Sequence, residues 1–292
     1  MSELLTAAGI VPISTEGDAE VTSVAADSRR CREGCCFVAV RGPDADGHAY
    51  IRQALQGGAA AVVCEDDAAV LADVPRAVVT DTQAAAGPLA QAIRGWPARK
   101  LTTLAVTGTN GKTTVAMLAR AVLEAAGHRT GIIGTIRYQV GEKVIPLPAN
   151  TTPGADELAA LTDEMVAAGC SHMVMEASSH ALHQKRTDGM EFQAAIFTNL
   201  SGDHLDYHGT MEAYLSAKRR LFASLSSEAT AVVNRDDSAS ERMAEAARGP
   251  VLWYGLSDLA DVRGRIERIL SLIHISEPTR PLYISYAVFC LK

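Results

Sequence analysis

The stretch TGTNGKTT, Thr107 to Thr114, lies between an apolar run typical of a strand and a longer run typical of a helix. The sequence LTTLAV precedes it and VAMLARAVLEAAG follows it, which is the order strand, glycine-rich loop, helix of a phosphate-binding loop. In the usual pattern G-x-x-x-x-G-K-S/T the first position is a glycine, whereas here that position is Val106 and the extra glycine is Gly108. The stretch therefore predicts a variant phosphate-binding loop in which one glycine has moved inward.

The chemistry of this loop indicates a nucleoside triphosphate. Glycines let backbone N–H groups approach phosphate oxygens at the positive end of a helix, and Lys112 adds a point charge. Thr113 is suited to bind magnesium through its hydroxyl. The alternative is a glycine-rich turn with a solvated lysine, but strand, loop and helix occur in the order that phosphate binding requires.

The composition is that of an α/β protein of about two domains. The chain has 292 residues, of which 48% are hydrophobic and 5% aromatic. The formal net charge is -7 without a long basic block, which argues against a nucleic-acid-binding surface. No uncharged run approaches the roughly 18 apolar residues of a membrane span, and the N-terminal MSELLTAAGIVPIS lacks the basic residues of a secretory signal. We expect a cytoplasmic protein that binds neither nucleic acid nor membrane.

Two α/β units follow one another along the chain. Residues 1–97 alternate strand-like runs such as CCFVAV and AAAVVCE with helical runs such as AYIRQALQGG. The stretch GWPARK combines glycine, proline and charge, so we place a domain boundary between residues 97 and 98. In residues 98–270, near-continuous apolar strands favour a buried, mostly parallel sheet. The expected strands there are LTTLAVT, TGIIGTI, SHMVMEASS, AAIFTNL and TAVVNRD, and the helices are TPGADELAALTDEMVAAG and TMEAYLSAKRRLFASL.

The six cysteines do not form a metal-binding or disulfide framework. Cys31, Cys35 and Cys36 cluster in CREGCC, but no second C-x-x-C pair or histidine pair accompanies them. Cys64 and Cys170 lie inside apolar runs. We expect reduced thiols with a structural role, as is usual in the cytosol.

Polar residues follow three of the expected strands at the point where each strand ends. The phosphate-binding loop follows LTTLAV, Glu176 and ASSHALHQKR end or follow SHMVM, and LSGDHLDYH follows AAIFTN. In an open parallel sheet, ligands bind outside the carboxyl ends of the strands. These three polar segments should therefore converge on one crevice.

Several further motifs occur in an order that resembles the Mur ligase family. They are DSR, GTNGKTT, NTTP, EASSHAL, FTNLSGDHLDYHGTMEAY and SAKRRLF, and the resemblance covers residues from about 20 to 269. The shifted glycine is the usual form in that family. The resemblance implies an ATP-dependent, ADP-forming amide ligase of peptidoglycan synthesis. Its DSR and HLDYHGTMEAY motifs imply the branch that adds the third amino acid, with meso-diaminopimelate favoured over L-lysine, to UDP-N-acetylmuramoyl-L-Ala-D-Glu.

The resemblance assigns roles to the polar strand ends. It implies that ATP phosphorylates the substrate carboxylate and that an amine attacks the resulting acyl phosphate, with Mg²⁺ bridging phosphate and carboxylate. Catalytic roles fall to Lys112, Glu176, His204 and Lys218, and magnesium ligation to Thr113, Glu176, His204 and Lys218. Lys218 matches the carbamylated lysine of the family, although on spacing alone it is a solvated lysine of an amphipathic helix. The phosphate-binding residues are Gly108, Thr109, Asn110, Gly111, Lys112, Thr113 and Thr114.

The substrate side comes from the same resemblance. Contacts to the UDP-sugar and peptide are implied for Ser28, Asn150, Thr151, Thr152, Ser178, Gln184 and Arg186, with uridine near Pro43 to Gly47. Arginine suits a diphosphate through its fork of donors. The alternatives are that Ser28 caps a turn, that Thr151 and Thr152 cap the helix begun at Pro153, and that Arg186 is solvated. We expect His180, His183 and His208 to line the crevice and His172 to be a strand residue.

The last residues depart from this resemblance. Residues 271–292 do not follow the family pattern, and we expect them to be a foreign segment on a truncated, monomeric chain that lacks a C-terminal amino-acid-binding domain and is inactive alone. A nucleotide- or UDP-sugar-binding protein without turnover therefore stays an alternative to the enzyme. Another ligase of the Mur or folylpolyglutamate synthetase type is the second alternative.

Overall fold

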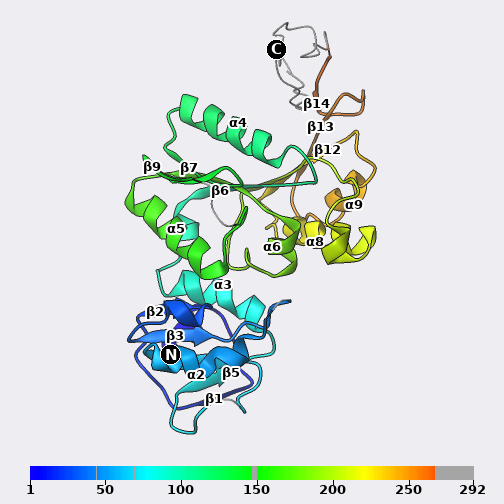
Figure 1. Cartoon of the computed structure of the whole chain (residues 1–292). Coiled ribbons are helices and arrows are strands. Elements are labelled where there is room, and N and C mark those ends of the chain that lie inside the picture. Colours follow the sequence, from blue (N-terminus) through cyan, green and yellow to red (C-terminus); the bar gives the residue numbers. More distant parts are fainter. Residues whose placement is uncertain (44, 69, 147–149, 267–292) are drawn as a thin grey trace, which may run out of the picture.

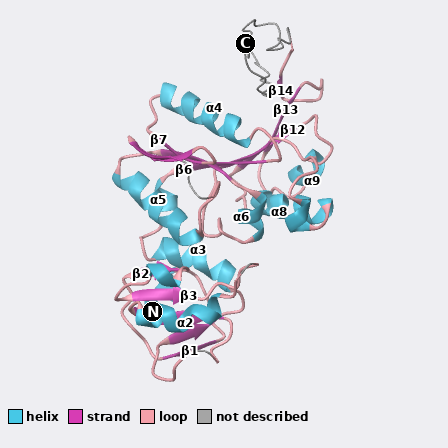
Figure 2. Cartoon of the chain, in the orientation of Figure 1, coloured by secondary structure: helices cyan, strands magenta, loops and turns pink. Residues whose placement is uncertain are grey.

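The computed structural model describes residues 1–43, 45–68, 70–146 and 150–266, and the segment 271–292 expected to be foreign lies outside this described part. Two α/β domains lie end to end, with helix α3 (Thr82–Ala92) at their junction (Figure 1). Figure 2 shows the sheet of each domain with helices packed against it. The α/β fold of two domains is thus confirmed.

The first domain is built on a five-stranded sheet in the order β1-β5-β4-β3-β2. Neighbouring strands are parallel except for β1 and β5. Alternate residues of β3 point to opposite faces, so that Cys36 and Val38 pack toward α3 while Cys35 and Phe37 pack toward α2. The strands are β1 (Ser14–Glu16), β2 (Ser23–Ala25), β3 (Cys35–Val38), β4 (Ala59–Cys64) and β5 (Arg76–Val78), and the other helices are α1 (Ser2–Ala7), η1 (Ser28–Arg30), η2 (Gly47–Tyr50) and α2 (Ile51–Gln56).

The second domain is built on a nine-stranded sheet in the order β14-β13-β12-β11-β6-β10-β7-β8-β9. All neighbouring strands are parallel except the pairs β7–β8 and β8–β9, which are antiparallel. The mostly parallel sheet is therefore confirmed. The strands are β6 (Thr102–Thr107), β7 (Thr130–Ile133), β8 (Arg137–Val140), β9 (Lys143–Pro146), β10 (His172–Glu176), β11 (Ala194–Phe197), β12 (Thr230–Asn234), β13 (Val251–Gly255) and β14 (Val262–Arg263).

Helices cover both faces of this sheet. Figure 1 shows α4 on one face and α5, α6 and α8 on the other. The bounds are α4 (Lys112–Ala125), α5 (Ala155–Ala167), α6 (Ser179–His183), α7 (Leu205–His208), α8 (Met211–Ala223) and α9 (Ser240–Ala244). Two of the helices begin at side-chain caps: Ser178 Oγ accepts from Ala181 N at 3.2 Å, and Thr210 Oγ1 accepts from Ala213 N at 3.1 Å.

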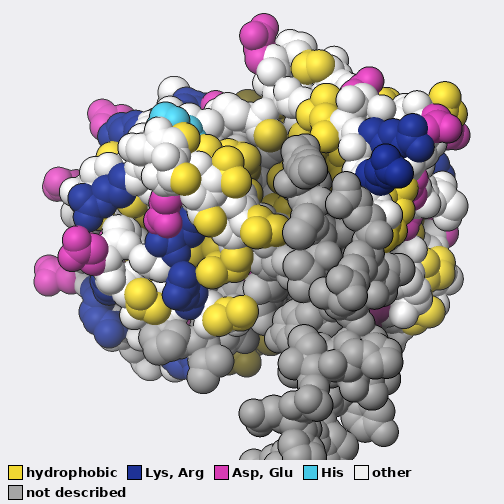
Figure 3. All heavy atoms as spheres, turned by 90° about the horizontal axis from the view of Figure 1, so that it is seen from above, with side chains coloured by type: hydrophobic (Ala, Val, Ile, Leu, Met, Phe, Trp, Pro, Cys, Tyr) yellow, Lys and Arg dark blue, Asp and Glu magenta, His cyan; other side chains and the backbone are white. Residues whose placement is uncertain are grey.

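Figure 3 views the molecule from above relative to Figure 1, from the side on which α4 lies, and apolar side chains gather near the centre of this face. Leu118 and Val122 of α4 are 60% and 68% exposed.

Among the described residues, no helix is long and apolar enough to cross a membrane. The five cysteines in the described part are free and buried, as the sequence predicts.

The two domains meet through close backbone contacts at α3. A Cβ atom at Gly87 would lie 1.8 Å from the carbonyl oxygen of Asp188, so this position admits no larger residue without a shift. An ion pair joins Lys185 to Asp81, the N-cap of α3. The chain passes between the domains at η3 (Pro97–Lys100), and the exact boundary at 97/98 stays a prediction.

Candidate functional site

The phosphate-binding loop joins the end of β6 to the start of α4. Gly108 has φ +150°, and a Cβ there would lie 1.9 Å from Thr198 Oγ1, while Gly111 has φ +84°. The end of β11 holds the loop in place, because Thr109 N donates to Asn199 O at 2.8 Å and Asn110 N to Asn199 Oδ1 at 3.0 Å. The loop therefore needs glycine at position 108 because Thr198 packs against it.

Two features of the loop suit it to phosphate. The first N–H groups of α4 have no partner within the helix, since N–H groups at a helix start never do. Lys112 folds back over the loop, and its Nζ donates to Gly108 O at 3.0 Å and Thr109 O at 2.8 Å. Burial lowers the pKa of the Lys112 ammonium, although Glu176 and Asp203 oppose this shift. A partly buried cation thus lies beside free N–H donors.

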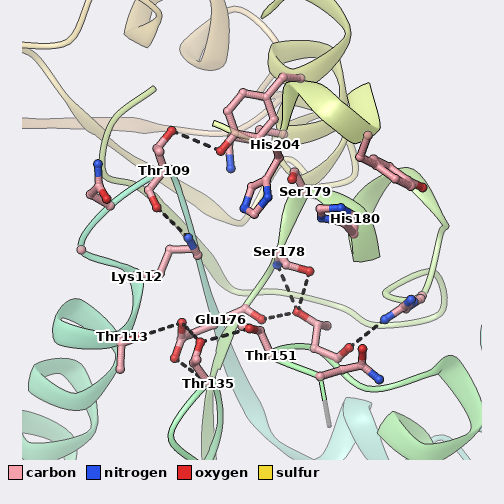
Figure 4. Close-up of a pocket in the computed structure, with 18 of the residues that line it drawn as sticks. Thr109, Lys112, Thr113, Thr135, Thr151, Glu176, Ser178, Ser179, His180 and His204 are labelled. Carbon is pink, nitrogen blue, oxygen red and sulfur yellow. Dashed lines mark hydrogen bonds between the residues drawn. The ribbon is translucent and has the colours of Figure 1, made fainter. Parts of the chain in front are cut away.

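Glu176 lies at the end of β10 opposite the start of α4. Its carboxylate is 1% exposed, with Oε2 accepting from Thr113 Oγ1 at 2.9 Å and from Thr135 Oγ1 at 3.1 Å (Figure 4). Oε1 accepts from Thr135 N at 2.9 Å. A buried carboxylate held by hydroxyl and amide donors, without a cationic side chain bonded to it, has oxygen ligands of the kind that Mg²⁺ prefers.

Lys218 lies on the buried side of α8. It is 1% exposed, and its Nζ donates to Gly108 O at 2.8 Å and lies 4.4 Å from the centre of the Tyr214 ring. Burial, together with the nearby charge of Lys112, lowers the pKa of the Lys218 amine to about 7. The alternative of a solvated lysine on the helix surface is therefore wrong.

His204 lies on the same cavity wall at the start of α7. Its backbone is left-handed, with φ 53°, and its ring lies edge-on to His180 with 4.9 Å between the ring centres. His180 lines the cavity, as expected, whereas His183 and His208 lie behind it in contact with Tyr207. The described residues contain no group of three or more His, Cys, Asp or Glu side chains placed to hold a metal ion.

Several substrate-side residues are held at the end of β10 by hydrogen bonds. Thr152 Oγ1 donates to Glu176 O at 2.7 Å and accepts from Ser178 N at 3.0 Å. The proposed cap of α5 by Thr151 and Thr152 is wrong, because Gly154 is the N-cap and Thr152 is bonded to β10. Arg186 is held inward, with Nη1 donating to Thr152 O at 3.1 Å, rather than solvated.

These groups line one cavity of about 780 Å³. Figure 4 shows Lys112, Thr113, Glu176, Ser178 and His204 around it. The predicted site residues that line it are Thr109, Asn110, Gly111, Lys112, Thr113, Thr114, Asn150, Thr151, Thr152, Glu176, Ser178, Gln184, Arg186, His204 and Lys218. The three polar strand ends therefore converge, as the sequence predicts.

Two of the residues assigned to nucleotide or substrate binding lie outside the cavity wall. Gly108 belongs to the loop, and its carbonyl oxygen accepts from both Lys112 and Lys218. Ser28 lies in the first domain, where it is 8% exposed and its Oγ donates to Gln53 Oε1 at 2.9 Å. It does not cap η1, because Asp27 accepts from Arg29 N there. Pro43 lines a separate cavity of about 130 Å³ at the domain junction, together with Gln184 and Arg186.

Sequence analysis missed several lining residues. Thr135, Ser179, Tyr207 and Tyr214 all line the cavity. Thr135 lies two residues after β7 and could have been found by the rule that located the other strand ends. Tyr207 lies in the polar segment LSGDHLDYH that was expected to reach the crevice, and Tyr214 lies in the same ordered motif, but neither was singled out.

Comparison with known proteins places this geometry in a family. The model of the Mur ligase middle domain matches residues 106–274, and that of the Mur ligase family, catalytic domain, matches residues 20–94. The chain is 42% identical over 248 residues to UDP-N-acetylmuramoyl-L-alanyl-D-glutamate–2,6-diaminopimelate ligase of Parabacteroides distasonis, covering 85% of this chain and 51% of that one. It is 48% identical over 225 residues to the enzyme of that name from Chlorobium phaeobacteroides, covering 76% and 44%.

Solved structures agree with this similarity. A structure of UDP-N-acetylmuramoyl-L-alanyl-D-glutamate–2,6-diaminopimelate ligase superposes with a TM-score of 0.70 at 31% identity, covering 84% of this chain and 52% of that one. MurF from Acinetobacter baumannii, at 20% identity and a TM-score of 0.60, covers 92% of this chain and 55% of its own and shares the fold. The chain spans about half the length of the curated relatives it matches.

Proposed function

The chain belongs to the Mur ligase family, and on that premise we propose that it carries the ATP- and substrate-binding part of a ligase that adds meso-diaminopimelate to UDP-N-acetylmuramoyl-L-Ala-D-Glu. The names of its relatives support this activity and this amino acid. The observation that carries the proposal is the single cavity in which the phosphate-binding loop, Glu176 and Lys218 face Thr152 and Arg186.

ATP would bind with its phosphates on the loop. The free N–H groups at the start of α4 and the ammonium of Lys112 supply donors and positive charge for the β- and γ-phosphates. The left-handed Gly111 supports this fit, because it lets the backbone turn into α4 without a side chain at the cavity wall. In this position the γ-phosphate would point toward Glu176 and Lys218.

The residues present fit magnesium. Thr113 Oγ1 and Glu176 Oε2 lie 2.9 Å apart at the loop, which supports a site in which both oxygens would hold one ion. His204 with a carbamate on Lys218 would hold a second. Bound Mg²⁺ would neutralise charge on the γ-phosphate and on the carboxylate that receives it. Hydrogen bonds from Thr113 and Thr135 orient the Glu176 carboxylate.

The surroundings of Lys218 support its carbamylation. A pKa of about 7 leaves a large share of the amine neutral and nucleophilic near neutral pH. The nitrogen of the neutral amine would attack the carbon of CO₂, forming an N–C bond while the π electrons of one C=O bond move to oxygen, and would release one proton, so that the neutral amine becomes an anionic oxygen ligand. Burial at 1% exposure would shield the carbamate from water.

The substrate would lie across the cavity from the loop. Its terminal carboxylate accepts the γ-phosphoryl group of ATP, the amine of diaminopimelate attacks the acyl phosphate, and the tetrahedral intermediate collapses to amide and phosphate. Arg186, Gln184 and Ser178 would orient the UDP-sugar and peptide, so that the carboxylate approaches the γ-phosphate. Holding both reactants in one cavity is the contribution that this chain's residues make.

Calorimetric titration of the chain tests this assignment. We expect UDP-N-acetylmuramoyl-L-Ala-D-Glu to bind more tightly than UDP-N-acetylglucosamine, because only the former reaches the residues around Thr152. Arg186→Ala should weaken binding by roughly 1.5–3 kcal/mol through loss of charged hydrogen bonds. Arg248→Ala, which removes an exposed arginine outside the cavity, should not change it. Equal affinity for the two ligands contradicts the proposed substrate.

A further inference from the structure

The loop that carries His204, residues 199–210, packs against the apolar core of its domain through Leu200. Its four-residue helix α7 has no buried residue, and the backbone is left-handed at His204 (φ 53°) and at Gly209 (φ 72°). Because α7 is not buried, polar and ring contacts contribute to the position of the His204 ring.

One end of the loop is tied to the phosphate-binding loop. Ser201 N donates to Thr109 Oγ1 at 2.9 Å, and that hydroxyl also lies 3.2 Å from Ser201 O. Thr109 is 8% exposed, so water competes little for these bonds. The nucleotide side of the cavity therefore positions the start of the loop.

The other end is tied to the substrate side through Tyr207. Its hydroxyl accepts from Gln184 Nε2 at 2.9 Å and lies 3.0 Å from His183 Nδ1, to which it can donate when that nitrogen is unprotonated. Its ring stacks on His180 with 4.1 Å between ring centres. Within the described part of the chain, the side-chain hydrogen bonds from α7 to other elements all end at this hydroxyl.

A continuous chain of hydrogen bonds extends from Tyr207 to the strand that carries Glu176. Gln184 Oε1 accepts from Arg186 Nε at 2.9 Å, and Arg186 Nη1 donates to Thr152 O at 3.1 Å. Thr152 Oγ1 in turn donates to Glu176 O at 2.7 Å. The His204 loop and the Glu176 strand are thus connected through residues placed to contact the substrate.

We propose that Tyr207 is a positioning residue that holds the His204 loop against Gln184 and Arg186, and so couples binding of the UDP-linked substrate to binding of the magnesium nucleotide. The inference rests on the proposed function for the identity of both ligands. A substrate that fixes Arg186 and Gln184 also fixes Gln184 Nε2, which is one of the two partners of the Tyr207 hydroxyl. The loop, and with it His204, then adopts one position when either ligand is bound, which lowers the cost of ordering it for the other.

Calorimetry on the full chain measures this coupling directly. The dissociation constant of Mg²⁺ with a non-hydrolysable ATP analogue is measured with and without saturating UDP-N-acetylmuramoyl-L-Ala-D-Glu. We expect a coupling of about tenfold in the unaltered chain, and the same factor when the order of addition is reversed. In Tyr207→Phe, which keeps the ring stacked on His180, we expect the coupling to fall to about twofold or less.

Two further variants keep the test decisive. Tyr254→Phe also removes a tyrosine hydroxyl, bonded to Phe197 O at 3.0 Å outside the cavity, and should leave the coupling unchanged. His183→Ala removes one of the two partners of the Tyr207 hydroxyl, should give an intermediate coupling, and carries the test if Tyr207→Phe does not fold. Failure of the unaltered chain to bind either ligand contradicts the proposed function. Binding of both ligands without coupling, or full coupling in Tyr207→Phe, overturns the role of Tyr207.

Discussion

The two domains present their predicted binding residues in different ways. In the second domain, residues from the ends of β6, β10 and β11 line one cavity, and the hydroxyls of two other lining residues, Thr113 and Thr152, are bonded to Glu176 or to its strand. In the first domain, Ser28 is 8% exposed and its hydroxyl is bonded to Gln53. A site at the strand ends of one parallel sheet is fixed by topology, whereas a site on loops of a separate domain depends on how two domains meet.

The largest effect should come from Gly108→Ala in the second domain. The new Cβ would lie 1.9 Å from Thr198 Oγ1 at a backbone φ of +150°, so the loop must move away from β11. We expect a loss of about 3–5 kcal/mol in the free energy of unfolding, measured in urea, from backbone strain and overpacking. Binding of the magnesium nucleotide should be lost with it.

Gly127→Ala is the matched control for this change. Gly127 also has a positive φ, +88°, but a Cβ there meets no atom within 4 Å. Gly127→Ala should lower the free energy of unfolding by about 1–2 kcal/mol, because of the left-handed backbone alone. It should leave nucleotide binding intact. Equal losses in the two variants would show that the contact with Thr198 does not set the loop, and would weaken the contrast between the domains.

Lys218→Ala should affect stability less than Gly108→Ala, but it should remove a specific modification, the carbamate on Lys218. With ¹³C-labelled bicarbonate, the chain should show a carbamate NMR signal that Lys218→Ala lacks and Lys143→Ala, which removes an exposed lysine, retains. Because only the neutral amine reacts with CO₂, the signal should grow as pH rises through the pKa of about 7 and fade below pH 6. A signal of equal strength in Lys218→Ala would place the carbamate elsewhere.

Sequence patterns locate the central strands of the second domain because these strands are buried on both faces. Runs such as LTTLAVT and TAVVNRD contain consecutive apolar residues, and they form β6 and β12. The two-residue strand β14 at the sheet edge lacks this signal, and its Val262 is 51% exposed. Strand β13, with the sequence VLWYG, carries the same apolar signal and was missed. The β8–β9 hairpin was missed, although the alternation of RYQV before Gly141, which has φ +57°, is a recognisable turn signal.

Site residues were predictable to the extent that they follow a strand or belong to an ordered motif. Glu176 satisfies both conditions, and the cavity contains it. The burial of Lys218 was not predictable from spacing, because a lysine on an amphipathic helix is usually solvated and only packing of α8 under Gly108 buries it. Tyr207 belongs to an ordered motif, but its contacts were not predictable, since its partners Gln184 and His183 lie 23 and 24 residues away and meet it only through the tertiary fold.

The smallest expected effect is that of Ser28→Ala in the first domain, and it sharpens the comparison most directly. The substitution removes the donor to Gln53 Oε1 at 2.9 Å and leaves that oxygen partly buried without its partner, so the free energy of unfolding should fall by about 0.5–1.5 kcal/mol. Ser14→Ala on the exposed strand β1 removes a hydroxyl without this loss and should leave the free energy of unfolding unchanged.

If the first domain holds uridine through Ser28, the dissociation constant of UDP-N-acetylmuramoyl-L-Ala-D-Glu in Ser28→Ala should also rise about three- to tenfold, because a neutral hydrogen bond contributes about that factor. A loss of stability with unchanged affinity would assign Ser28 to the packing of α2 on η1 alone. The substrate-binding residues would then all belong to the second domain, and the first would contribute through its contact at α3.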